Sequence, residues 1–107
     1  MYKRRAHVVF FAADDLLVQK ALRCVQTLAT DWVEARSYTH PLTDCDLLIT
    51  LDAQGLRDLP PLPQGVRHKH WPLSPAAVEW DLEAHVKGLV GGMRLLASLD
   101  HSAAPPR

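Results

Sequence analysis

The stretch HVVFFAADDLLVQKALRCVQT, residues 7–27, decides the fold. It opens with a continuous apolar run at residues 8–11 bounded by polar residues, which predicts a strand over residues 7–12 that is buried on both faces. A helix to about Ala29 is predicted next, because apolar residues recur at helical spacing: Leu17, Ala21, Cys24, Val25 and Leu28. A strand running directly into a helix is the first unit of an α/β fold, and such folds usually bind ligands at the turn between the two.

Three further segments have the pattern of strands. Residues 32–38 alternate between apolar and polar side chains, which predicts a strand near an edge of the sheet. Residues 46–51 form a second continuous apolar run and predict another buried parallel strand. Residues 66–71 predict a fourth strand, after a loop at residues 52–65 that has room for one helical turn before its three prolines.

The last part of the sequence predicts a long helix. Ser74 followed by Pro75 fits a helix start, with serine as the N-cap and proline at the first helical position. The residues that follow carry an apolar stripe at spacings of three and four: Val78, Leu82, Val86, Leu89, Met93 and Leu96. Residues 102–107 are rich in proline and alanine and predict a disordered tail, so the folded domain is expected to span residues 1–101.

The order of these elements predicts an α/β fold. A small, open, four-stranded parallel sheet in the order 2-1-3-4, with right-handed crossovers and helices on both faces, accommodates them in a flavodoxin-like three-layer arrangement. The carboxyl ends of strands one, three and four would then meet at one edge of the sheet, where doubly wound folds bind their ligands.

The composition limits the classes of function. The 107 residues include 12 basic and 12 acidic ones, and this zero net charge argues against a nucleic-acid binder. No apolar segment approaches the roughly 20 residues that a membrane-spanning helix needs, and no signal peptide is recognisable. Two cysteines in no paired spacing, Cys24 and Cys45, favour a reducing cytoplasmic setting.

The sequence resembles the low-molecular-weight protein tyrosine phosphatases and the thioredoxin-coupled arsenate reductases that share their fold. Residues 7–28 resemble the first strand, phosphate-binding loop and first helix of that family, and residues 33–41 resemble its second strand. Residues 44–51 and 66–75 resemble the third and fourth strands, and His70-Trp71-Pro72 before a long helix is most like the reductase branch.

The same resemblance implies that the family's chemistry is lost. The position of the cysteine nucleophile holds Ala12, that of the anion-binding arginine Val18, that of the general acid Ser74, and that of the reductases' further cysteine Asp52. The degenerate active-site loop, together with Ser74, consists of Ala12, Ala13, Asp14, Asp15, Leu16, Leu17 and Val18. It lacks glycine, and each aspartate would repel an incoming oxyanion by about 4 kcal/mol at 4 Å and an effective dielectric near 20.

The acidic pair after the first strand has two other interpretations. Receiver domains place two acids there to hold Mg²⁺ and a phosphorylated aspartate after the third strand, so Asp14, Asp15 and Asp52 could form a cation site. The last strand has no lysine at its end, which argues against that class. Helix capping by Asp14 or Asp15 is the simpler explanation.

The remaining candidate residues favour structural roles. His68 and His70 project to one side of a strand, but two ligands are too few for a structural zinc site. Cys24 fits the helix's apolar face, and flanking aspartates would raise the pKa of Cys45. Trp80 lies off the apolar stripe and could mark a partner surface.

These observations lead to three hypotheses. The first is a catalytically inactive phosphatase-like protein, with no cofactor or metal, that binds an unidentified partner protein or forms a homodimer. The second is a receiver-like signalling module that binds Mg²⁺ through the three aspartates. The third is a divergent enzyme of unidentified chemistry.

Overall fold

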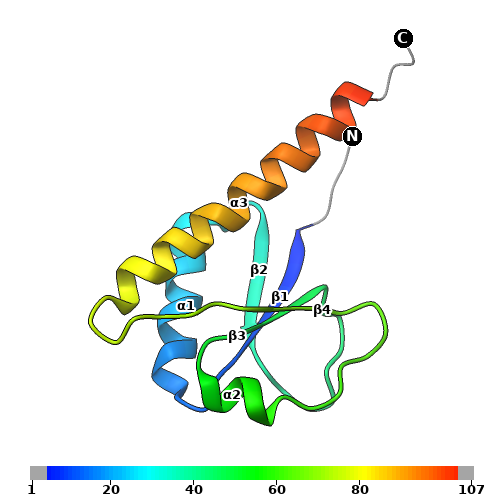
Figure 1. The fold of residues 1–107 in the computed structure, drawn as a ribbon. Helices are drawn as coiled ribbons and strands as arrows, with labels where there is room; N and C mark the ends of the chain where they lie inside the picture. The colour runs from blue at the N-terminus through cyan, green and yellow to red at the C-terminus, as the bar shows by residue number, and fades with distance from the viewer. Residues whose placement is uncertain (1–4, 104–107) are drawn as a thin grey trace.

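The computed structural model describes residues 5–103, with side chains for residues 5–93. All four strands are parallel and form one sheet in the order β2-β1-β3-β4 (Figure 1). The predicted α/β class and strand order are therefore confirmed. The elements in chain order are β1 (Ala6–Phe11), α1 (Asp15–Leu28), β2 (Val33–Ser37), β3 (Leu47–Thr50), α2 (Ala53–Asp58), β4 (Arg67–His70) and α3 (Val78–Ala103).

One face of the sheet carries the main core. Val8 and Phe10 of β1, with Ile49 of β3, point to this face and are fully buried. They pack against residues of α1 and α3, and Phe10 also contacts Trp71, with ring centroids 5.6 Å apart. The buried helix residues are Val18, Ala21 and Val25 of α1 and Leu82, Val86 and Val90 of α3.

The other face is covered mainly by chain that is not helical. Val9 and Leu48 point to this face by alternation and are also fully buried. Right-handed crossovers place the connections at residues 38–46 and 51–66 here, because these run across the sheet in the direction opposite to the β1–α1–β2 unit. The Arg36 guanidinium holds the first connection by donating to the carbonyl oxygens of Thr43 and Asp44. The third layer is therefore thin, with α2 as its only helix among the described residues.

The start of α3 differs from the prediction. Ser74 does not cap the helix: its carbonyl accepts from Ala77 N (2.9 Å) in a turn, and its amide donates to the Asp81 carboxylate (2.6 Å). The first helical bond runs from Asp81 N to Ala77 O (2.9 Å), so α3 begins at Val78. Ser74 therefore belongs to a turn that precedes α3, and the Asp81 carboxylate holds this turn against the helix.

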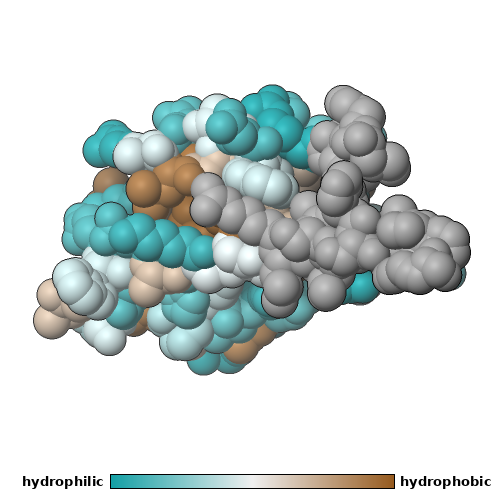
Figure 2. Space-filling view, turned by 90° about the horizontal axis from the view of Figure 1, so that it is seen from above, coloured by the Kyte–Doolittle hydropathy of each residue, from teal (hydrophilic) through white to brown (hydrophobic). Residues whose placement is uncertain are grey.

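The helix α3 is 26 residues long and runs past the sheet (Figure 1). It includes residues 102 and 103 of the predicted tail, and residues 104–107 lie outside the described part. In the view from above, the coloured part of the surface is mostly hydrophilic, with an apolar area to the left of the grey atoms (Figure 2). No described helix is long and apolar enough to cross a bilayer.

Candidate functional site

The turn between β1 and α1 is shorter than the loop expected over residues 12–18. β1 ends at Phe11 and α1 begins at Asp15, so three residues connect them. Asp14 is the N-cap, and its carboxylate accepts from Leu16 N at 3.0 Å. This confirms the capping interpretation of the acidic pair and explains the short turn, because the cap starts the helix early.

Four members of the expected loop, residues 15–18, therefore belong to the helix. Leu16 is exposed in its first turn, and Leu17 is half-buried against the core. Val18 is 4% exposed and lies inside the core cluster. A side chain at position 18 points into the core beneath α1, so this position does not line the turn.

The amides of the turn are occupied by a carboxylate of the chain itself. Asp52 accepts from Ala13 N through Oδ1 and from Asp14 N through Oδ2, both at 3.1 Å. Its Oδ1 also accepts from Gly55 N at 2.7 Å, which makes Asp52 the N-cap of α2. Converging amides of this kind are what a phosphate-binding turn offers to a ligand. Here they hold an internal anion.

The sheet brings Asp52 to this place. Phe11 and Thr50 are partners across β1 and β3, so the residues after them leave the same edge of the sheet side by side. The approach of α2 to the turn is close: a Cβ on Gly55 would lie 2.8 Å from Asp52 Oδ1 and 3.0 Å from the Ala12 Cα. Any larger residue at position 55 would collide with these atoms, so glycine allows the first turn of α2 to approach the β1–α1 turn this closely.

The surroundings of Asp52 favour its ionised form. Partial burial alone would raise the pKa of the Asp52 carboxyl, but the amides of Ala13, Gly55 and Asp14 and the charge of His70 outweigh it. The pKa is therefore held below its usual range. The carboxylate is an ionised, hydrogen-bonded part of the fold.

The three aspartates of the receiver hypothesis do not assemble a cation site. Within the described residues, no group of three or more histidine, cysteine, aspartate or glutamate side chains is placed to hold a metal ion. The Asp52 carboxylate accepts from backbone amides of the turn, and the Asp14 carboxylate accepts from Leu16 N as the N-cap. Asp15 lies in the first turn of α1.

Sequence reasoning missed a polar cluster beside this turn. The fully buried Thr50 hydroxyl lies 3.1 Å from Nε2 of His68 and 2.8 Å from Nδ1 of His70. The same-side projection of the two histidines was predicted, but their shared partner on β3 was not. Because Thr50 is inaccessible, its hydroxyl cannot attack a substrate, and the cluster ties β4 to β3.

Both thiols are poorly suited to nucleophilic chemistry. Burial, with a smaller contribution from Glu83, raises the pKa of Cys24. Burial also raises the pKa of Cys45, with Asp46 adding a smaller effect. The predicted direction for Cys45 is confirmed, although the main cause is desolvation and not the flanking carboxylates. Neither thiol lies in the turn.

A separate hollow of about 290 Å³ lies at the opposite edge of the sheet, where the strands begin. Its lining includes His7, Cys45 and two aspartates, Asp44 and Asp46. Asp46 accepts from the backbone amide of His7 at 2.9 Å, so at least one of these carboxylates joins β1 to the start of β3.

Ser74 and Trp80 lie beyond β4. Ser74 is exposed, and its backbone accepts from Ala77 N and donates to the Asp81 carboxylate in the turn before α3. Trp80 is 74% exposed in the first turn of α3, as its phase predicted.

Comparison with known proteins adds no assignment. No protein-family model matches this sequence, and no characterised protein matches it significantly.

Proposed function

We propose that this chain is a non-catalytic member of the phosphatase and arsenate reductase fold that acts by binding a partner protein. The observation that carries the proposal is the Asp52 carboxylate, which occupies the amides of Ala13, Asp14 and Gly55. A turn closed by an internal anion does not need an external one, and an ionised carboxylate repels an oxyanion at the same place.

The side chains around the turn also lack the groups that phosphoryl or arsenate chemistry needs. That chemistry uses a low-pKa thiol and a cation that clamps the oxyanion. Ala12 supplies no nucleophile, and Val18 faces the core, where an arginine would be buried away from the turn. The strand order 2-1-3-4 agrees with the resemblance, although other doubly wound folds share it.

The proposal extends to the setting in which the protein works. Both cysteines are free, which suits a reducing compartment, and we propose on that ground that the protein works in the cytoplasm.

The test measures oxyanion binding and turnover together. Calorimetric titration of the wild-type protein with inorganic phosphate and with arsenate is expected to show no saturable binding. The wild-type protein should also not hydrolyse p-nitrophenyl phosphate. Asp52→Ala frees three amides and is expected to gain weak phosphate binding, seen as a phosphate-dependent rise in melting temperature. Asp58→Ala, at the other end of α2, is the matched control. Saturable phosphate binding or hydrolysis by the wild-type protein would refute the proposal.

A further inference from the structure

The outward side of α3 carries little charge. Leu82, Val86 and Val90 are buried against the core, so the residues on the opposite side of the helix face outward. These residues form what we call the outer face, and all of them are exposed: Trp80, Ala84, Lys87, Gly88 and Gly91. Only Lys87 among them is charged, whereas the exposed residues of α1 are all polar except Leu16. A helix surface that stays in water is ordinarily polar, so the composition of the outer face indicates a contact surface.

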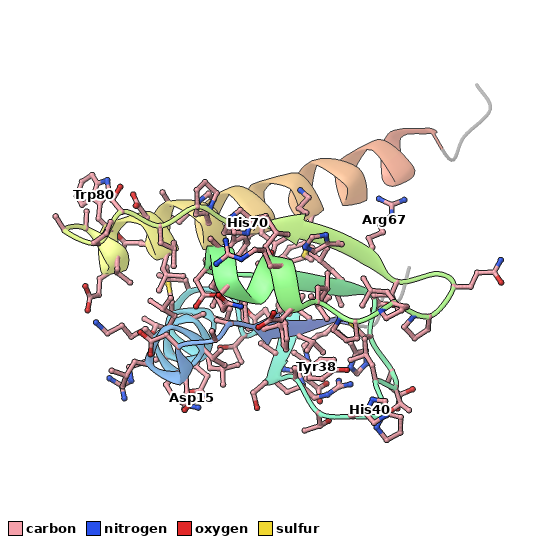
Figure 3. The ribbon with its side chains drawn as sticks, turned by 60° about the horizontal axis from the view of Figure 1, so that its bottom comes forward. Asp15, Tyr38, His40, Arg67, His70 and Trp80 are labelled. Carbon is pink, nitrogen blue, oxygen red and sulfur yellow. The ribbon has the colours of Figure 1, made fainter. Side chains whose placement is uncertain are left out.

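Trp80 projects from the outer face as a knob. Its side chain is 74% exposed, more than any other large hydrophobic side chain that the structure describes. Figure 3 shows it at the start of α3, pointing away from the rest of the molecule. Because tryptophan side chains often supply much of the binding energy at protein interfaces, Trp80 is suited to anchor a contact through this face.

Further along the helix, the outer face offers a hole. Ala84, Lys87, Gly88 and Gly91 are spaced three or four residues apart, and four such neighbours form the hole that receives a side chain from a facing helix. Three of the four have no side chain larger than a methyl group. A Cβ added to Gly88 or to Gly91 would meet nothing within 4 Å. The hole therefore has room for a large aromatic ring.

The knob and the hole are placed as a two-fold contact requires. The centre of the hole lies between Lys87 and Gly88, about 11 Å along the helix axis from Trp80 at 1.5 Å per residue. Ala84 stands midway between the two. When a second α3 packs antiparallel about a two-fold axis at Ala84, the partner's Trp80 meets the hole of the first copy, and Trp80 of the first copy meets the hole of the second. Such a surface is complementary to itself.

The charges beside the outer face also fit the antiparallel arrangement. Glu83 and Lys87 lie on one flank of α3, with their side chains 4.0 Å apart. The same two-fold axis brings Lys87 beside the partner's Glu83, whereas a parallel contact would bring each lysine beside its own copy. Two other acids near the start of α3 have contacts within the chain, because Glu79 is paired with Lys20 and Asp81 accepts from a backbone amide of the preceding turn.

We propose that this protein forms a homodimer through the outer face of α3, in which Trp80 of each copy packs into the hole of the other. The occupant is a second copy because one helix face supplies both the knob and the hole, at the spacing that pairs them. One helix from each copy makes the contact, so dimerisation should depend on protein concentration. The inference goes beyond the proposed function, which is carried by the β1–α1 turn and not by α3.

The experiment is sedimentation equilibrium of the full chain from low to high micromolar concentration. The wild-type protein is expected to show a monomer–dimer equilibrium. Trp80→Ala should weaken dimerisation at least about tenfold, because the knob is lost. Gly91→Leu should weaken it by a similar factor, since leucine fills the hole, and should not lower the melting temperature, since the site is open. Gly92→Leu is the matched control: Gly92 is equally open but lies about 100° around the helix from Gly91, outside the hole.

A mixture of two charge variants tests the orientation of the helices. Lys87→Glu and Glu83→Lys should each weaken self-association, because each places like charges across the contact. The two variants mixed in equal amounts should associate more strongly than either alone, since the heterodimer restores opposite charges at both pairs. Added salt should reduce this difference.

Four outcomes would overturn the inference. They are a wild-type protein that stays monomeric, a dimer that Trp80→Ala leaves intact, equal effects of Gly91→Leu and Gly92→Leu, and a charge mixture no stronger than its components. A monomeric wild-type protein that binds a different protein through Trp80 would assign the outer face to that partner. Circular dichroism of each variant confirms that it is folded. None of these results depends on oxyanion binding, so the dimer and the closed turn can fail separately.

Discussion

Asp52→Ala tests the central structural claim, since Asp52 joins three segments of the chain. Its carboxylate accepts from Ala13 N and Asp14 N in the β1–α1 turn and from Gly55 N in α2. Alanine keeps the backbone and removes all three bonds. The expected result is a folded protein of lower stability.

The magnitude follows from the three bonds. Loss of an aspartate N-cap costs about 1–2 kcal/mol. The two bonds to the turn contribute about 0.5–1 kcal/mol each, which is below the usual range for hydrogen bonds to a charged group, because Ala13 and Asp14 are exposed and water can replace the carboxylate. The total is about 2–4 kcal/mol, which corresponds to a fall in melting temperature of at least about 8 °C in a domain of this size.

The loss of stability in Asp52→Ala should depend on pH in a direction that the pKa of Asp52 determines. The folded-state pKa of Asp52 is lowered, so the folded protein binds fewer protons than the unfolded chain, and its stabilisation is fully present above the unfolded pKa of about 3.9. It is lost as the pH falls through the folded pKa. The difference between wild type and Asp52→Ala should therefore be constant near neutral pH and shrink below about pH 4.

The assay is urea unfolding followed by circular dichroism, at neutral pH and at several acidic values. Asp58→Ala is the control, because Asp58 is an exposed aspartate of the same helix that accepts from the Gln54 side-chain amide. It should change stability by no more than about 0.5 kcal/mol. A loss for Asp52→Ala no larger than that of the control, or a loss that is the same at all pH values, would refute the reasoning.

Three further predictions concern other parts of the fold. Gly88→Ala should stabilise the protein by about 0.5–1 kcal/mol in thermal unfolding, because nothing lies within 4 Å of the added Cβ. Gly55→Ala should destabilise it, because the added Cβ would lie too close to Asp52 and Ala12. The opposite order of stabilities would contradict this packing. Cys24 and Cys45 should react slowly with a disulfide reagent at neutral pH and faster as the pH rises past the ordinary thiol pKa, and a fast phase at neutral pH would count against burial as the cause. Val18→Arg should lower the free energy of unfolding in urea by at least about 3 kcal/mol without conferring phosphate binding, since position 18 lies in the core. A stable variant that binds phosphate would instead support the active-site loop expected over residues 12–18.

The central part of the fold could be predicted from the sequence. The apolar runs at residues 8–11 and 47–51 are long enough to indicate strands buried on both faces, and both form the middle of the sheet. The strand β4 has no such run, because an edge strand with exposed side chains needs little apolar surface.

The candidate site could be predicted only in part. The N-cap formed by Asp14 is a local interaction, so it could be predicted from the sequence. The bonds from Asp52 to the turn span 38 and 39 residues, so no local pattern contains them. The start of α3 was misplaced because the Ser74-Pro75 pattern is also that of a turn, and the deciding contact comes from Asp81, seven residues later.

The two outer strands have a consequence for how molecules of this protein meet. An open sheet has unpaired backbone groups along both sides, and such sides can recruit strands from other molecules into aggregates. Here β2 carries Glu34 and Arg36, and β4 carries Arg67 and Lys69, within strands of only five and four residues. Charged side chains on short outer strands oppose strand addition. The sheet should therefore stay at four strands even in concentrated solution.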